Sequence, residues 1–211
     1  MSDRSTDSGL PRDPAEPGER ASGGASGNAR LTGSIGALTF VVLAAEGLTL
    51  LGVRQLISAH VFIGMLLVPA VAVKTASTLY RFSRYYAGRP DYVIKGPPPI
   101  ILRFLGPAVV VTTIGVLVTG IGALAAGPST RWLVQAHKLS FLIWFAAMTV
   151  HVLGHILETP ALAFADWRRA ESSQVPAARM RIIVLIVTVA VGLGLATASL
   201  SWIGSWHHAS H

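Results

Sequence analysis

Several ionisable side chains stand well inside long apolar stretches of this chain, and they are the residues best placed to do chemistry. They are Glu46, His60, Lys74, His137, His151 and His155. An ionisable group inside a membrane-spanning segment is costly to bury and usually serves a function. Imidazoles bind metal ions, relay protons or hydrogen-bond between helices. The chain has no cysteine, which excludes disulfides, thiolate metal sites and cysteine-ligated iron–sulfur clusters.

These side chains lie in apolar blocks whose lengths predict five transmembrane helices. The blocks cover residues 31–53, 55–80, 104–130, 132–157 and 182–206, and about 20 residues suffice to cross the hydrocarbon core of a bilayer. The net charge of +7 comes from basic residues at the block ends, which fits lipid headgroups better than nucleic acid. We therefore predict an all-α integral membrane bundle that contacts the lipid bilayer and binds no nucleic acid.

The charged segments predict the domain boundaries and the orientation. Residues 1–29 are rich in Ser, Gly, Pro and charged side chains, so we expect a disordered cytoplasmic tail before a transmembrane domain over 30–206. Residues 207–211 would form a short external tail. Basic residues gather in the loops after the second and fourth blocks, namely Arg81, Arg84, Arg89, Lys95, Arg103, Arg168, Arg169, Arg179 and Arg181. The positive-inside rule then places the N-terminus in the cytoplasm and the C-terminus outside the plasma or inner membrane.

His60 and His137 are expected at similar depth in the outer leaflet. The second and fourth helices run in the same direction, and each histidine lies a few residues from the start of its helix. Two imidazoles at one depth on two helices can ligate a haem iron from opposite faces. Gly64, one turn below His60, would let a flat macrocycle approach. The alternative is that the two histidines make interhelical hydrogen bonds.

The fourth helix carries a second regularity. His137 and His151 are 14 residues apart, which returns to within about 40° of the same face and descends about 21 Å. This spacing predicts a second haem near the inner surface, with His155, one turn further, as a replacement for His151. A quinone hydrogen bond and a histidine at the inner interface are the alternatives for both residues.

The stretch His60-Val-Phe-Ile-Gly64 with Pro69 and Lys74, followed by His137 and His151, resembles the membrane cytochrome b superfamily over residues 31–160. That superfamily includes the cytochrome b subunits of formate dehydrogenases and hydrogenases, and small haem proteins associated with molybdopterin oxidoreductases. The resemblance implies that His60 and His137 are axial ligands of an outer haem b, and that His151 belongs to an inner one. Diheme relatives supply the other inner ligand from a histidine on the first or second helix. This sequence has no histidine in its first helix, and 14 residues after His60 it has Lys74 instead. The resemblance is therefore compatible with one haem or with two.

Three other side chains have a functional and a structural interpretation. Lys74 could extend its ammonium to the inner headgroups, or ligate iron as a neutral amine. Glu46 could orient an imidazole, carry protons for a quinol, or hydrogen-bond to a neighbouring helix as a neutral carboxyl. Arg131, together with Lys138, could pair with the propionates of the outer haem or with lipid phosphate.

The expected function is that of a b-type cytochrome subunit that transfers electrons between a partner redox protein and the quinone pool. The partner would be a molybdopterin oxidoreductase or another dehydrogenase. No catalytic residue is identifiable, so we expect an electron-transfer subunit rather than a complete enzyme. The alternative is a small transporter or assembly factor in which the intramembrane His, Lys and Glu residues form a proton relay.

Overall fold

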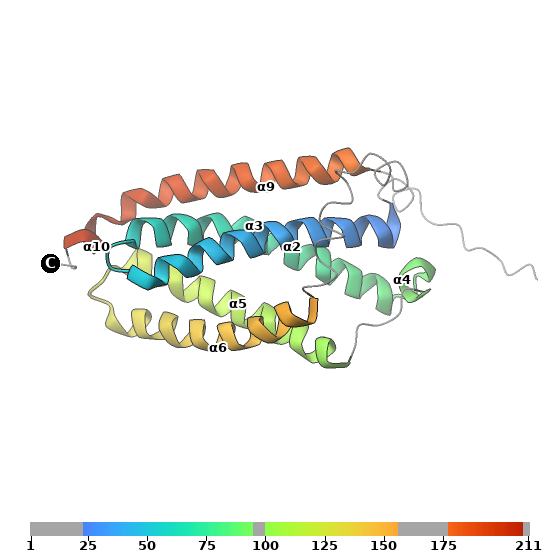
Figure 1. The fold of residues 1–211 in the computed structure, drawn as a ribbon, viewed down its shortest axis with the longest axis horizontal. Coiled ribbons are helices and arrows are strands. Elements are labelled where there is room, and N and C mark those ends of the chain that lie inside the picture. Colours follow the sequence, from blue (N-terminus) through green and yellow to red (C-terminus); the bar gives the residue numbers. More distant parts are fainter. Residues whose placement is uncertain (1–22, 95–99, 156–176, 209–211) are drawn as a thin grey trace, which may run out of the picture.

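The structure is a computed structural model that describes residues 23–94, 100–155 and 177–208; at 100–103, 154–155 and 207–208 it describes the backbone alone. Within these residues every regular element is a helix. The elements are α2 (Gly24–Thr49), η1 (Leu50–Gly52), α3 (Ile57–Tyr86), α4 (Pro90–Ile94), α5 (Ile100–Ala126), α6 (Arg131–His155), α9 (Ala178–Ser199), η2 (Leu200–Trp202) and α10 (Gly204–His208) (Figure 1).

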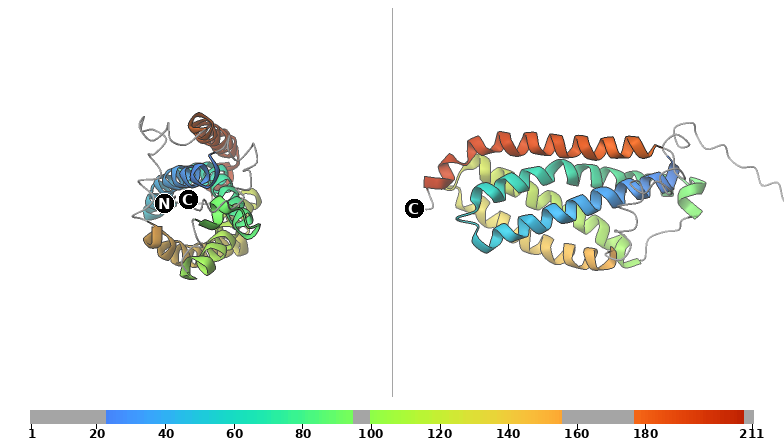
Figure 2. Two further views of the ribbon diagram at one scale, coloured as in Figure 1. Left: turned by 90° about the vertical axis from the view of Figure 1, so that its right-hand side faces the viewer. Right: turned by 45° about the horizontal axis from the view of Figure 1, so that its top comes forward.

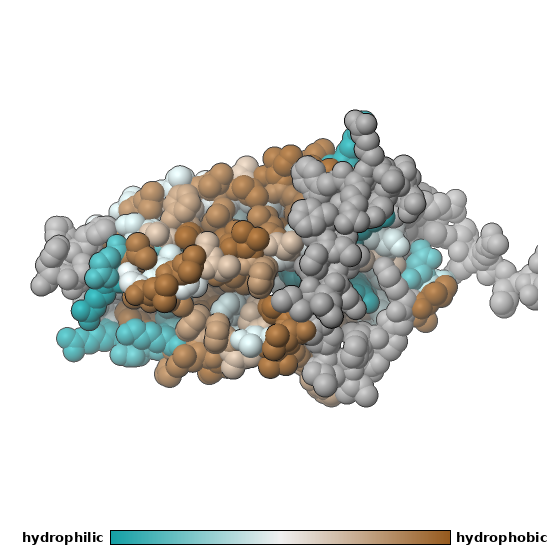
Figure 3. Space-filling view, in the orientation of Figure 1, coloured by the Kyte–Doolittle hydropathy of each residue, from teal (hydrophilic) through white to brown (hydrophobic). Residues whose placement is uncertain are grey.

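Five of the described helices are long and apolar enough to cross a membrane, as predicted: α2 with η1, α3, α5, α6 and α9 with η2. Large apolar side chains are exposed along them, for example Val118, Ile143 and Val191. Figure 3 shows hydrophobic residues over the middle of the visible face and hydrophilic residues towards its ends. A continuous exposed apolar surface of this kind fits lipid and would be unfavourable in water. The chain is therefore a multi-pass membrane protein.

The first helix begins at Gly24, ahead of the boundary expected at residue 30. Composition assigned residues 24–29 to the tail, but they are helical because they pack against the rest of the fold. Gly24, Ala25 and Gly27 are buried, and the side-chain amide of Asn28 donates to the backbone carbonyl of Ser77 at 3.1 Å. The small residues at the start of α2 allow it to approach α3 closely. Amino-acid composition alone does not predict such a contact. The expected tail over residues 1–22 lies outside the described residues.

The helices form two groups that face each other across a cavity. In one group α3 packs along both α2 and α9, and in the other α5 packs along α6, while α3 and α5 touch only locally. Figure 2 shows α9 on the outer side of the first group, away from α5 and α6. α2, α3, α5 and α6 all contribute residues to the cavity wall. The fold therefore places its interior space between the second and fourth predicted spans.

Polar side chains and glycines hold each group together. The indole nitrogen of Trp144 donates to the hydroxyl of Thr113 at 2.9 Å, which joins α6 to α5. The hydroxyls of Thr32 and Ser77 lie 2.9 Å apart and join α2 to α3. Interhelical hydrogen bonds in lipid contribute on average about 0.6 kcal/mol each. Gly192 gives α9 its close contact with α3, because a Cβ atom there would lie 2.9 Å from the carbonyl oxygen of Leu66.

Candidate functional site

The cavity between the two helix groups has a volume of about 1940 Å³ and a mainly apolar wall. Glu46, His60, Lys74, His137 and His151 all line it. Pockets for small ligands usually measure about 300–1,000 Å³, so this cavity has room for more than one large lipophilic group. The ionisable residues that the sequence singled out therefore share one space. The side chain of His155 lies outside the described residues.

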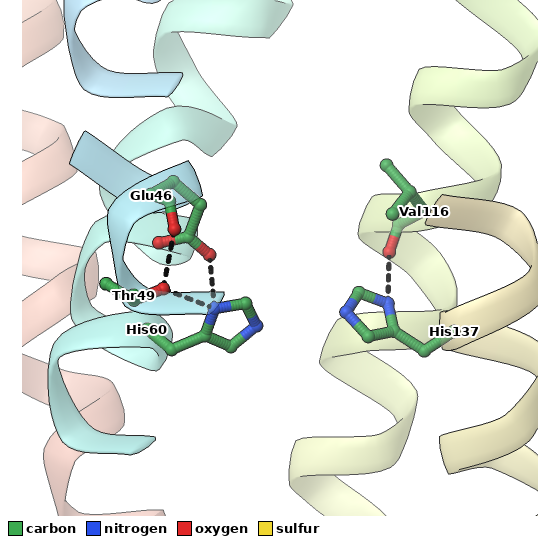
Figure 4. Close-up of polar contacts among 5 residues, drawn as sticks. All are labelled: Glu46, Thr49, His60, Val116 and His137. Carbon is green, nitrogen blue, oxygen red and sulfur yellow. Dashed lines mark hydrogen bonds and ion pairs between the residues drawn. The ribbon is translucent and has the colours of Figure 1, made fainter. Parts of the chain in front are cut away.

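The imidazoles of His60 and His137 face each other across this space. Their ring centroids are 6.2 Å apart and their planes meet at 69°. Figure 4 shows each ring extending from its own helix into the gap between α3 and α6, with its unbonded nitrogen directed towards the other ring. The predicted match in depth between these two histidines is confirmed.

On the α3 side, two acceptors fix the ring of His60. Its Nδ1 atom lies 2.9 Å from Oε1 of Glu46 and 3.0 Å from the hydroxyl oxygen of Thr49. That hydroxyl donates to the backbone carbonyl of Glu46 at 2.6 Å, so it can only accept from the histidine. Both neighbours of Nδ1 therefore accept, which places the ring proton on Nδ1 and leaves the lone pair on Nε2.

On the α6 side, the neighbouring helix α5 fixes the ring of His137. Its Nδ1 atom donates to the carbonyl oxygen of Val116 at 3.0 Å, which again leaves the lone pair on Nε2. The hydroxyl of Thr119 lies 3.4 Å from the same nitrogen and hydrogen-bonds to Ser140 at 2.9 Å. Gly120 supplies the space for the ring, because a Cβ atom there would lie 2.9 Å from its Cε1 atom.

Two imidazoles in this arrangement match the geometry of a metal ion held between them. Two metal–imidazole bonds of about 2 Å, with about 1.1 Å from each nitrogen to its ring centre, place the centroids about 6.2 Å apart. The observed separation is 6.2 Å. Each plane need only contain the line through the two nitrogens and the metal, so the angle of 69° is compatible with this. Histidines that ligate metals usually donate Nδ1–H to a carboxylate or a backbone carbonyl, and both partners occur here.

The type of metal centre follows from the number of donors. In the part of the chain that the structure describes, no three His, Asp or Glu side chains gather into a metal-binding group. Two opposed imidazoles alone leave a metal ion under-coordinated, whereas a haem iron receives its other four ligands from the macrocycle. The wide apolar cavity around the two rings also suits a flat lipophilic cofactor. These residues therefore fit haem.

The other end of the cavity holds Lys74 and His151. Lys74 lies 14 residues beyond His60 on α3, about 21 Å along the helix. Its ammonium turns to α2, where it donates to the carbonyl of Thr32 at 3.3 Å and fills the space left by Gly36. It therefore does not extend to the inner headgroups. An ammonium carries three donors, so a cavity ligand can accept from it as well.

Three remaining candidate residues lie around the site. Gly64 lines the cavity, and a Cβ atom there would lie 3.4 Å from Oε1 of Glu46, an ordinary van der Waals distance, so the Glu46–His60 bond does not require a glycine here. Lys138 lines the cavity next to His137. Arg131 is exposed at the start of α6 and is not among the described residues that line the cavity.

Sequence reasoning did not identify Thr49, Val116, Thr119 or Gly120. Val116 acts through its backbone carbonyl, which no residue type reveals. Gly120 gave a weak signal, as a glycine on an uncharged span close in depth to His137. Comparison with known proteins adds no relative, because no protein-family model, curated protein or solved structure matches the chain.

Proposed function

We propose that the protein is a b-type cytochrome subunit that carries electrons between a partner redox protein and membrane quinone, with haem b held by His60 and His137. The observation that carries the proposal is the facing pair of imidazoles, whose centroids lie 6.2 Å apart. Each ring donates Nδ1–H to a fixed acceptor and directs Nε2 into the cavity. These bonds also join α3 to α2 and α6 to α5, as the interhelical alternative expects, but that alternative gives no reason for both Nε2 atoms to face one cavity.

When bound, haem b supplies one-electron transfer within the membrane. The chain's own residues do the positioning. Glu46 and Thr49 hold the imidazole of His60, and Val116 and Gly120 set that of His137. The mainly apolar wall of the cavity surrounds the two rings.

The inner half of the cavity is the proposed place for a quinone headgroup. Quinone carbonyls are hydrogen-bond acceptors, and Lys74 presents an ammonium inside the cavity whose one acceptor among the described residues is the carbonyl of Thr32. His151 lines the same region. The apolar wall between these residues and the histidine pair suits the isoprenoid part of such a molecule.

A partner protein follows from the length of the segments between the spans. The segment between α2 and α3 and the segment between α5 and α6 contain only a few residues. Residues 87–99 and 156–177 are also too short to hold a second redox domain, because independent domains usually exceed about 50 residues. The segments between the spans thus supply no second redox centre, and we propose that a partner protein supplies it.

The test is the optical spectrum of the purified protein. We expect a red protein whose Soret and α bands change on addition of dithionite. His60→Ala and His137→Ala should each remove the same spectral species while the protein still inserts, because both residues hold one iron. Gln135→Ala, an exposed polar position on the same helix as His137, is the matched control and should keep the full haem content.

The hydrogen bond between Glu46 and His60 also suits the alternative, a proton relay in a non-redox membrane protein. In such a relay the two imidazoles would have to exchange protons, yet their centroids are 6.2 Å apart and no hydrogen bond joins them. A colourless protein whose His60→Ala and His137→Ala variants lose proton transport would favour the relay and overturn the cytochrome proposal.

A further inference from the structure

We propose that Glu46 is a positioning residue for the haem ligand His60, and that its carboxylate makes the two axial imidazoles electronically unequal and lowers the potential of the haem. This inference rests on the proposed function. It concerns a residue on α2, a helix that supplies no iron ligand. The evidence is the difference between the acceptors of the two histidines.

The two Nδ1 atoms donate to groups of different charge. His60 donates to Oε1 of Glu46 at 2.9 Å, and His137 donates to the backbone carbonyl of Val116 at 3.0 Å. A hydrogen bond to a carboxylate is charge-assisted and stronger than one to a neutral carbonyl. This bond draws the Nδ1 proton of His60 towards the carboxylate. The Nε2 atom of His60 is therefore a more basic electron-pair donor than that of His137. His60 is thus the stronger of the two ligands.

The carboxylate also acts through its charge. Within the part of the chain that the structure describes, Oε1 bonds to His60, and Oε2 is buried without a hydrogen-bond partner. Glu46 is the acidic residue among the described residues that line the cavity, where the other charged side chains are Arg54, Lys74, Arg81 and Lys138. A ferric haem with two neutral imidazoles carries a net positive charge at the iron, and the ferrous form does not. A carboxylate bonded to the ligand stabilises the ferric form and lowers the potential.

Local structure keeps Glu46 in this position. α2 ends at Thr49 and continues as η1, so Glu46 and Thr49 lie on its last turn, where both reach His60. The side-chain exposures of His60 and Glu46 are 20% and 16%, which limits competition from solvent for this bond.

The experiment compares the redox titration of Glu46→Gln with that of the parent protein. Glutamine keeps an oxygen that accepts from Nδ1–H but removes the charge, so we expect a higher midpoint potential for the haem that the variant retains. Thr49→Val removes the neutral acceptor from the same nitrogen and is the matched control, with a smaller shift. An unchanged potential in Glu46→Gln would overturn the inference. A parent protein that binds no haem would instead overturn the proposed function.

If the Glu46→Gln variant does not retain haem, a measurement on the unmodified protein still tests the inference. We expect the redox-induced infrared difference spectrum to contain carboxylate bands that shift when the protein is labelled with ¹³C-glutamate. In the sequence the other glutamates, at positions 16, 19, 158 and 171, fall outside the apolar blocks, so we expect them to contribute nothing. A difference spectrum without label-sensitive carboxylate bands would show that Glu46 does not sense the iron, and the inference would fail.

Discussion

A Cβ atom at Gly120 would lie 2.9 Å from Cε1 and 3.2 Å from Nδ1 of His137. The ring has little freedom to retreat, because Nδ1 is bonded to the carbonyl of Val116 at 3.0 Å. The orientation of the proposed iron ligand on α6 thus depends on the absence of a side chain on α5.

Substitutions at Gly120 should weaken haem binding. Overpacking of a tight contact costs about 1–3 kcal/mol, so we expect Gly120→Ala to reduce haem affinity by about tenfold and Gly120→Val to abolish binding. Haem content per protein after purification measures the effect. Gly115→Ala is the matched control on the same helix, because no atom lies within 4 Å of its added Cβ. Full haem content in Gly120→Val would show that the ring of His137 does not need this space.

A substitution at Gly192 should separate α9 from α3 without changing the haem ligands. An added Cβ would lie 2.7 Å from a side-chain methyl and 2.9 Å from the carbonyl oxygen of Leu66, and backbone cannot give way cheaply. We expect Gly192→Ala to lower the unfolding free energy in detergent by about 1–3 kcal/mol. The spectrum of the remaining folded protein should be unchanged. Gly194→Ala, with nothing within 4 Å, should be neutral, and equal losses in both variants would contradict this account.

The half of the cavity around Lys74 and His151 should hold quinone rather than a second haem. The structure aims one pair of described histidines at each other, and Lys74 turns to α2 instead of presenting a ligand to His151. We expect one haem per chain, retained in His151→Ala, His155→Ala and Lys74→Met.

Quinone reduction should slow about tenfold in Lys74→Met, since a hydrogen bond to a charged donor contributes about 1.5–3 kcal/mol. Haem counting by the pyridine haemochrome assay, with quinone turnover in the same samples, tests both statements. A parent with two haems that falls to one in any of these variants would establish an inner haem.

Reporter fusions should reveal the orientation. A reporter after residue 90 should read cytoplasmic and one at the C-terminus external, because basic residues gather at the end of the molecule that holds the α3–α4 connection. The opposite pattern would move the His60–His137 pair to the cytoplasmic side and reverse the side from which the partner protein delivers or accepts electrons.

The sequence alone determined those features that depend on distance along a single helix. Five spans follow from the lengths of apolar blocks, and the shared depth of His60 and His137 follows from the fixed rise per residue. The placement of His137 and His151 on one cavity wall follows from the helical period.

Only the tertiary structure decided which helix faces which histidine. Helices in lipid are apolar on nearly every side, so the hydrophobic pattern carries little information about their rotation. The Glu46–His60 bond, the carbonyl of Val116 beside His137 and the need for glycine at position 120 all depend on that rotation. The start of α2 at Gly24 has the same origin, because contacts with α3 extend the helix into a segment whose composition indicates none.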